Sequence, residues 1–174
     1  TPFRTPQLVL ETVRDELVDS SPVGSLLDVC CGTGAGMETL APLCSERLVG
    51  IDFSRGMLDV AREHTARLEG PPAIEFVHGN VLEMTFQEEF DLAVCFGAHG
   101  HILRRDEPRF VEQIYRALRP GGRFVFVTST MPPPWSGAFW FGRGFNAAMR
   151  VRNLLIRPPF IMYYLTFLLP AVEE

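Results

Sequence analysis

The stretch that decides the fold reads Leu26-Leu27-Asp28-Val29-Cys30-Cys31-Gly32-Thr33-Gly34-Ala35-Gly36. Its first half is a short apolar run broken only by Asp28, which is typical of a strand buried in a parallel sheet. The glycines that follow let the backbone approach a ligand and present N–H groups before a helix. The dinucleotide fingerprint G-x-G-x-x-G is not met, because the third glycine comes one position early, at Gly36. The stretch predicts a strand, a ligand-binding loop and a helix, and it counts against NAD or FAD.

The alternation of strands and helices continues outward from this stretch to residue 130. Apolar runs predict strands at residues 26–30, 48–51, 73–77, 90–96 and 123–128. Helical spacing predicts helices at residues 6–19, 34–43, 55–68 and 107–118, with Ser54 and Asp106 as the N-caps of the last two. This order indicates an α/β fold, a doubly wound, mostly parallel Rossmann-like sheet with flanking helices.

Composition narrows the class of protein. The chain has 174 residues, of which 47% are hydrophobic and 21% charged, as in globular domains. Its net charge of −5 argues against nucleic acid as a partner. Cys30, Cys31, Cys44 and Cys95 have no zinc-ligand spacing, so we expect no metal and buried free thiols in a reducing compartment. With no signal pattern at its start, we expect a cytoplasmic protein.

Residues 131–174 break the strand–helix pattern. They are rich in Pro, Phe, Trp and Arg, and the first acidic residue is Glu173. We therefore divide the chain into an α/β domain, residues 1–130, and a capping or lid segment, residues 131–174. The most apolar stretch, 154–170, is interrupted by Arg157 and two prolines, which predicts no transmembrane segment. Contact with a membrane surface and the oligomeric state stay open.

Two carboxylates stand out near the glycine loop. Asp28 lies inside an apolar strand, where a carboxylate is costly without partners. It either accepts hydrogen bonds from the loop amides or also contacts a cationic ligand. Asp52 ends the second predicted strand about twenty residues after the loop, where nucleotide-binding α/β folds place the acid that binds ribose hydroxyls. The alternative for Asp52 is a cap on the helix that follows.

Five motifs in this order and spacing resemble those of class I S-adenosylmethionine-dependent methyltransferases. They are LLDVCCGTGAG, VGIDFSRGMLDVARE, FVHGNVLEM, FDLAVCFGAHGHIL and RALRPGGRFVFVT, and the resemblance covers residues 20–130. The combination of the first two looks like the quinone-biosynthesis C-methyltransferases and other small-molecule methyltransferases. The resemblance implies S-adenosylmethionine as cofactor and a small, hydrophobic or aromatic molecule as substrate.

The same resemblance implies a set of cofactor-binding residues at the ends of the strands. They are Asp28, Cys30, Gly32 and Gly34 for the methionyl part, Asp52 for the ribose, Phe53 and Met57 beside the adenine, Asn80 and Val81 at the adenine edge, and Cys95, Phe96 and Gly97 beneath the methionyl and sulfonium groups.

Three departures from the family pattern are visible. Cys30 stands where the family often has glycine, and Asn80 replaces a more usual Asp, although its amide oxygen can still accept from the adenine amino group. The sheet also lacks the last two of the usual seven strands. Because the chain starts at Thr1 and stops in what reads like the start of a helix, we expect the natural protein to be longer.

A base for the reaction would come from the loop after the fourth strand. His101 and His99 follow that strand at the edge where ligands sit in open α/β sheets, so either could take a proton from the acceptor. Two other functions stay open. They are a nicotinamide-dependent oxidoreductase and a non-catalytic cofactor-binding module on the same fold.

Overall fold

The computed structural model describes residues 5–20, 22–96, 102–127, 133–137, 139–141 and 143–144. The chain divides into two compact units, Thr1–Val127 and Thr128–Glu174. The helices and strands below all belong to the first unit.

The first unit is built on a parallel sheet with the strand order β3-β2-β1-β4-β5. The strands are β1 (Val23–Val29), β2 (Cys44–Asp52), β3 (Ala73–His78), β4 (Phe90–Phe96) and β5 (Leu118–Val127). β1 pairs with β2 on one side and with β4 on the other, so the strand order reverses between β1 and β4. In open α/β sheets ligands bind outside the carboxyl ends of the strands at such a switch point. The predicted doubly wound parallel sheet is confirmed.

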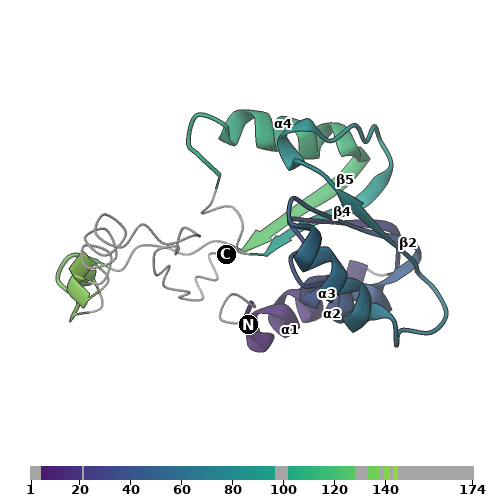
Figure 1. Ribbon diagram of the computed structural model, residues 1–174, viewed down its shortest axis with the longest axis horizontal. Coiled ribbons are helices and arrows are strands. Elements are labelled where there is room, and N and C mark those ends of the chain that lie inside the picture. Colours follow the sequence, from purple (N-terminus) through teal and green to yellow (C-terminus); the bar gives the residue numbers. More distant parts are fainter. Residues whose placement is uncertain are drawn as a thin grey trace. The chain divides into compact units, whose positions relative to one another are not determined.

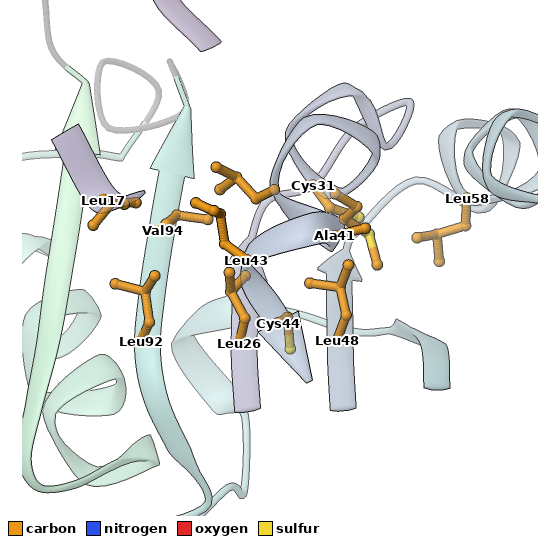
Figure 2. Close-up of a cluster of buried hydrophobic side chains, with 12 residues drawn as sticks. Leu17, Leu26, Cys31, Ala41, Leu43, Cys44, Leu48, Leu58, Leu92 and Val94 are labelled. Carbon is orange, nitrogen blue, oxygen red and sulfur yellow. The ribbon is translucent and has the colours of Figure 1, made fainter. Parts of the chain in front are cut away.

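Helices cover both faces of this sheet (Figure 1). The helices are α1 (Gln7–Leu17), α2 (Ala35–Leu40), α3 (Arg55–Thr65) and α4 (Glu107–Ala117). Along β1, Leu26 packs in the cluster shared with the first three helices, which Figure 2 shows, whereas Leu27 packs in the cluster shared with α4. This alternation places Asp28 on the same face as Leu26, toward α2.

Several element bounds differ from the prediction. β2 begins at Cys44, four residues earlier than expected, and α2 gives way to a 3-10 turn at Ala41–Leu43. β5 begins at Leu118, where it pairs with Phe90, and its next pair joins Arg123 to Leu92. The residues in between loop out of the register, and Gly121 there has a φ of +83°, which glycine adopts readily. The Pro-Gly-Gly sequence therefore leaves the ladder, and regular pairing with β4 resumes at Arg123, where the strand was predicted to begin.

The two predicted helix caps have different outcomes. The Ser54 hydroxyl accepts a hydrogen bond from the Met57 N–H at 3.4 Å, which confirms it as the N-cap of α3. Asp106 stands at the predicted N-cap position of α4, but its side chain makes no capping hydrogen bond. Asp106 has helical backbone angles, and its carboxylate lies 3.6 Å from Arg105 Nε.

Two further expectations concern free thiols and membrane-spanning segments. None of the four cysteines forms a disulfide; three are buried, and Cys30 is half-buried. Among the described residues, no helix combines the length and the apolar character that crossing a membrane requires.

Candidate functional site

A small pocket lies at the switch point, at the carboxyl ends of β1 and β4. Its volume is about 80 Å³, and it is lined by Thr5, Asp28, Cys30, Cys31, Gly32, Thr33, Ala35, Gly36 and Phe96. A larger hollow of about 520 Å³ lies between the end of α3 and the start of β3, and none of the predicted site residues lines it. The chemistry of the small pocket, together with its place in the fold, makes it the candidate site.

The loop after β1 turns through three residues with positive φ. Gly32 has a φ of +54° and Gly34 of +77°, and Cys30 adopts +60°, a value that favours glycine. A Cβ on Gly34 would lie 3.0 Å from Ala61 Cβ on α3, so the loop packs tightly against that helix. A Cβ on Gly32 would meet nothing within 4 Å. The loop is thus fixed on its protein side and open at Gly32.

The third glycine of the stretch has a packing role. A Cβ on Gly36 would lie 2.7 Å from Asp28 Oδ2 and 2.7 Å from Phe96 Cδ2. No side chain fits there, because the first turn of α2 rests directly on the Asp28 carboxyl and the Phe96 ring. Gly36 therefore brings the helix close enough to the strands to cover Asp28.

Asp28 is a fully buried acid without a hydrogen-bond partner. Its side chain is 1% exposed, and neither carboxyl oxygen is hydrogen-bonded. The pKa of Asp28 is raised to about 8. Burial is the larger cause, and the negative charge of Asp52 is the second. The Met37 N–H faces the carboxyl and opposes this rise without reaching hydrogen-bond geometry. The alternative in which Asp28 accepts hydrogen bonds from the loop amides is wrong.

Asp52 makes the loop contacts instead. Its Oδ2 accepts a hydrogen bond from the Gly32 N–H at 2.9 Å, and its Oδ1 accepts one from the Ser54 N–H at 2.8 Å. The carboxylate thereby ties the glycine loop to the end of β2. An ionised carboxylate offers about four acceptor sites, so two remain for further donors.

The residues predicted beside the adenine lie at the next strand ends. Phe53 follows β2 with its side chain 76% exposed, and its ring centroid is 6.5 Å from that of His78. Met57, in the first turn of α3, is half-buried. Asn80 Oδ1 accepts a hydrogen bond from the Leu82 N–H at 3.0 Å, so this oxygen also caps the 3-10 turn Val81–Glu83. Val81 is buried.

The end of β4 contributes one residue to the pocket. Phe96 lines it, whereas Cys95 is fully buried in the core cluster shared with α4. Burial and the neighbouring Cys95 raise the pKa of the Cys30 thiol, which keeps it protonated. Gly97, His99 and His101 lie outside the described residues.

The structure also adds site residues that the sequence reasoning missed. Thr5, Thr33 and Ala35 line the pocket. A ring nitrogen of His64 on α3 lies 3.1 Å from the Thr33 carbonyl oxygen. Thr33 and Ala35 lie within the glycine motif, whereas no sequence signal marks Thr5 or His64. Within the described ranges, no three His, Cys, Asp or Glu side chains gather so as to hold a metal ion.

Comparison with known proteins gives the family. Residues 26–122 match the model of a methyltransferase domain family. The chain is 34% identical over 110 residues to a demethylmenaquinone methyltransferase of Oceanobacillus iheyensis, covering 61% of this chain and 44% of that protein. It is 33% identical over 126 residues to the enzyme of that name from Bacillus cereus, covering 70% and 51%. The chain thus spans about half the length of these relatives.

A solved structure agrees with the family model. An N-methyltransferase from Bradyrhizobium japonicum, in complex with S-adenosyl-L-homocysteine, superimposes with a TM-score of 0.65 at 25% identity. The match covers 72% of this chain and 62% of that one.

The buried acid should make stability depend on pH. Folded Asp28 keeps its proton up to about pH 8, whereas the unfolded chain releases it near pH 4. Between these values folding binds a proton, so this residue lowers the stability as pH rises, by at most about 1.4 kcal/mol per pH unit. We expect Asp28→Asn to remove this slope.

Urea unfolding at a series of pH values measures the effect. The free energy of unfolding of Asp28→Asn minus that of the wild type should grow from pH 4 to pH 8 and level off above. Parallel pH profiles for the two proteins would show that Asp28 is not held neutral.

Proposed function

The chain belongs to the class I S-adenosylmethionine-dependent methyltransferase family, and we propose that it transfers the methyl group of S-adenosylmethionine to a small, hydrophobic or aromatic molecule. The observation that carries this proposal is the unpartnered, buried Asp28 carboxyl, which lines the same pocket as the open side of Gly32. A buried acid without a partner is costly, and a ligand with a cationic group would offset that cost.

The residues present fit this cofactor. Asp28 and the loop through Cys30, Gly32 and Gly34 would hold the cationic methionyl part, and the free acceptor sites of Asp52 would receive the ribose hydroxyls. The other residues that we propose as cofactor contacts are Phe53, Met57, Asn80 and Val81 around the adenine, and Phe96 and Gly97 at the end of β4. Cys95 would contribute only its backbone, because its side chain is buried in the core.

The cofactor and the protein would contribute different parts of the methyl-transfer reaction. Bound S-adenosylmethionine supplies a methyl group activated by the sulfonium. The protein orients the acceptor in line with that methyl group and keeps water away. We propose His101, with His99 as the second candidate, as the base that removes a proton from the acceptor.

The substrate class rests on two features. The curated relatives carry the name demethylmenaquinone methyltransferase, which supports a quinol-like acceptor. Residues 131–174, which we expect from the sequence to form a lid, are rich in aromatic side chains, and this composition supports an apolar acceptor. Most of these residues lie outside the described ones. As the sequence leads us to expect, we propose the cytoplasm as the location.

A substitution at Gly32 tests whether the glycine loop binds the cofactor. Its φ of +54° and the open space beside it mean that an alanine Cβ would project toward the proposed ligand without touching protein. We expect Gly32→Ala to weaken binding of S-adenosylhomocysteine at least tenfold by calorimetry, because the ligand approaches the loop backbone closely. Gly121→Ala is the matched control, since Gly121 has a φ of +83° and equally open space but lies between Leu118 and Arg123, where β5 leaves the ladder. Equal affinities for both variants would show that the loop serves only the turn.

Methyl transfer to a panel of quinols, phenols, fatty acids and amines tests the reaction. We expect turnover with quinols or phenols, and His101→Ala should lower turnover by roughly a hundredfold or more while S-adenosylhomocysteine still binds. A preference for small polar amines would contradict the substrate class. Cofactor binding without transfer to any acceptor would favour the non-catalytic module, and binding of NAD alone would favour the oxidoreductase.

A further inference from the structure

We propose that His64 and His78 are positioning residues that hold the two loops of the cofactor site in their binding geometry. The proposal rests on the proposed function, and it adds two residues outside the set that the family likeness implies. His64 Nδ1 lies 3.1 Å from the Thr33 carbonyl oxygen, and His78 Nε2 lies 3.0 Å from the Phe53 carbonyl oxygen. Each histidine therefore reaches from a neighbouring element to the backbone of one loop.

The direction of these hydrogen bonds is set by the acceptor. A carbonyl oxygen only accepts, so the ring nitrogen facing it must carry the proton. In its neutral form His64 is therefore the Nδ1–H tautomer, and His78 is the Nε2–H tautomer. The charged imidazolium has both N–H groups, so each bond forms in either protonation state.

His64 completes the attachment of the glycine loop. Asp52 holds the Gly32 N–H at 2.9 Å from one side, and the Gly34 N–H donates to the Cys31 carbonyl at 2.9 Å. Thr33, between these glycines, has its carbonyl held by His64 from α3. Ala61, one turn earlier on α3, is the residue against which Gly34 packs. The peptide of Thr33 lies between two conformationally permissive glycines. Without His64, its carbonyl loses the hydrogen bond that holds it to α3.

His78 does the same for the loop after β2. Its bond to the Phe53 carbonyl is next to the bond from the Gly79 N–H to the Asp52 carbonyl at 3.0 Å. These two hydrogen bonds hold the backbone of Asp52 and Phe53 in place. They thereby position the Asp52 carboxylate and the Phe53 ring. The Phe53 ring itself is left 76% exposed and available to a flat ligand.

Calorimetric titration of the chain with S-adenosylhomocysteine tests the proposal. We expect His64→Ala and His78→Ala each to weaken binding roughly three- to tenfold, the worth of one hydrogen bond that sets loop geometry. Ser45→Ala is the matched control, because the Ser45 hydroxyl also bonds a carbonyl of another strand, that of Val23 at 3.2 Å, but at the amino ends of the strands. Its affinity should equal that of the wild type.

Rescue by amides separates positioning from a general loss of stability. The amide nitrogen of Asn takes roughly the place of Nδ1, and that of Gln the place of Nε2. We therefore expect His64→Asn and His78→Gln to restore affinity, and the crossed variants His64→Gln and His78→Asn not to. Circular dichroism during heating checks that every variant folds.

A shortened ligand provides a second readout. Methylthioadenosine lacks the amino-acid part, so His64→Ala should weaken it less than S-adenosylhomocysteine, whereas His78→Ala should weaken both alike. Folded alanine variants that bind as the wild type, or amide variants without the stated pattern, would overturn the positioning role alone. A wild-type chain that binds no S-adenosylhomocysteine would overturn the proposed function together with it.

Discussion

The burial of the Asp28 carboxyl is the constraint on which the rest of the site depends. The carboxyl lies where β1, the first turn of α2 and the Phe96 ring meet, and the contact is so close that only glycine fits at position 36. The carboxyl has no hydrogen-bond partner, and burial, followed by the charge of Asp52, raises its pKa to about 8. Burying such a group lowers the folding stability. A destabilising group that is kept in this way is characteristic of a binding site.

The loops around Asp28 are held by polar contacts that leave their ligand side free. Asp52 joins the glycine loop to the end of β2, and two histidines hold the Thr33 and Phe53 carbonyls. The positive φ of Cys30 costs energy in a residue other than glycine, and this anchored loop maintains it. Such anchoring lowers the ordering cost when a ligand binds.

Sequence reasoning succeeded where a local pattern sets the structure. The predicted β4 range matches the structure to the residue, because an apolar run between Glu89 and Gly97 has clear ends, and the Ser54 cap follows from its place before an amphipathic helix. It failed where contacts between residues far apart in the sequence determine the structure. The pairing of Leu118 with Phe90 starts β5 before the predicted Arg123, and the Gly32 N–H donates its hydrogen bond to Asp52 instead of Asp28. The His64 contact, 31 residues away along the chain, has no sequence signature.

Proton release on ligand binding tests the central claim most directly. With its pKa raised to about 8, we expect Asp28 to be mostly protonated at pH 7 in the free protein, and an ammonium group beside it would lower its pKa. Calorimetry of S-adenosylhomocysteine binding at pH 7, in buffers of different ionisation enthalpy, should show release of close to one proton. Methylthioadenosine, which lacks the ammonium group, should release none, and neither should Asp28→Asn with either ligand. Binding to the wild type without proton release, or equal release from Asp28→Asn, would contradict the account.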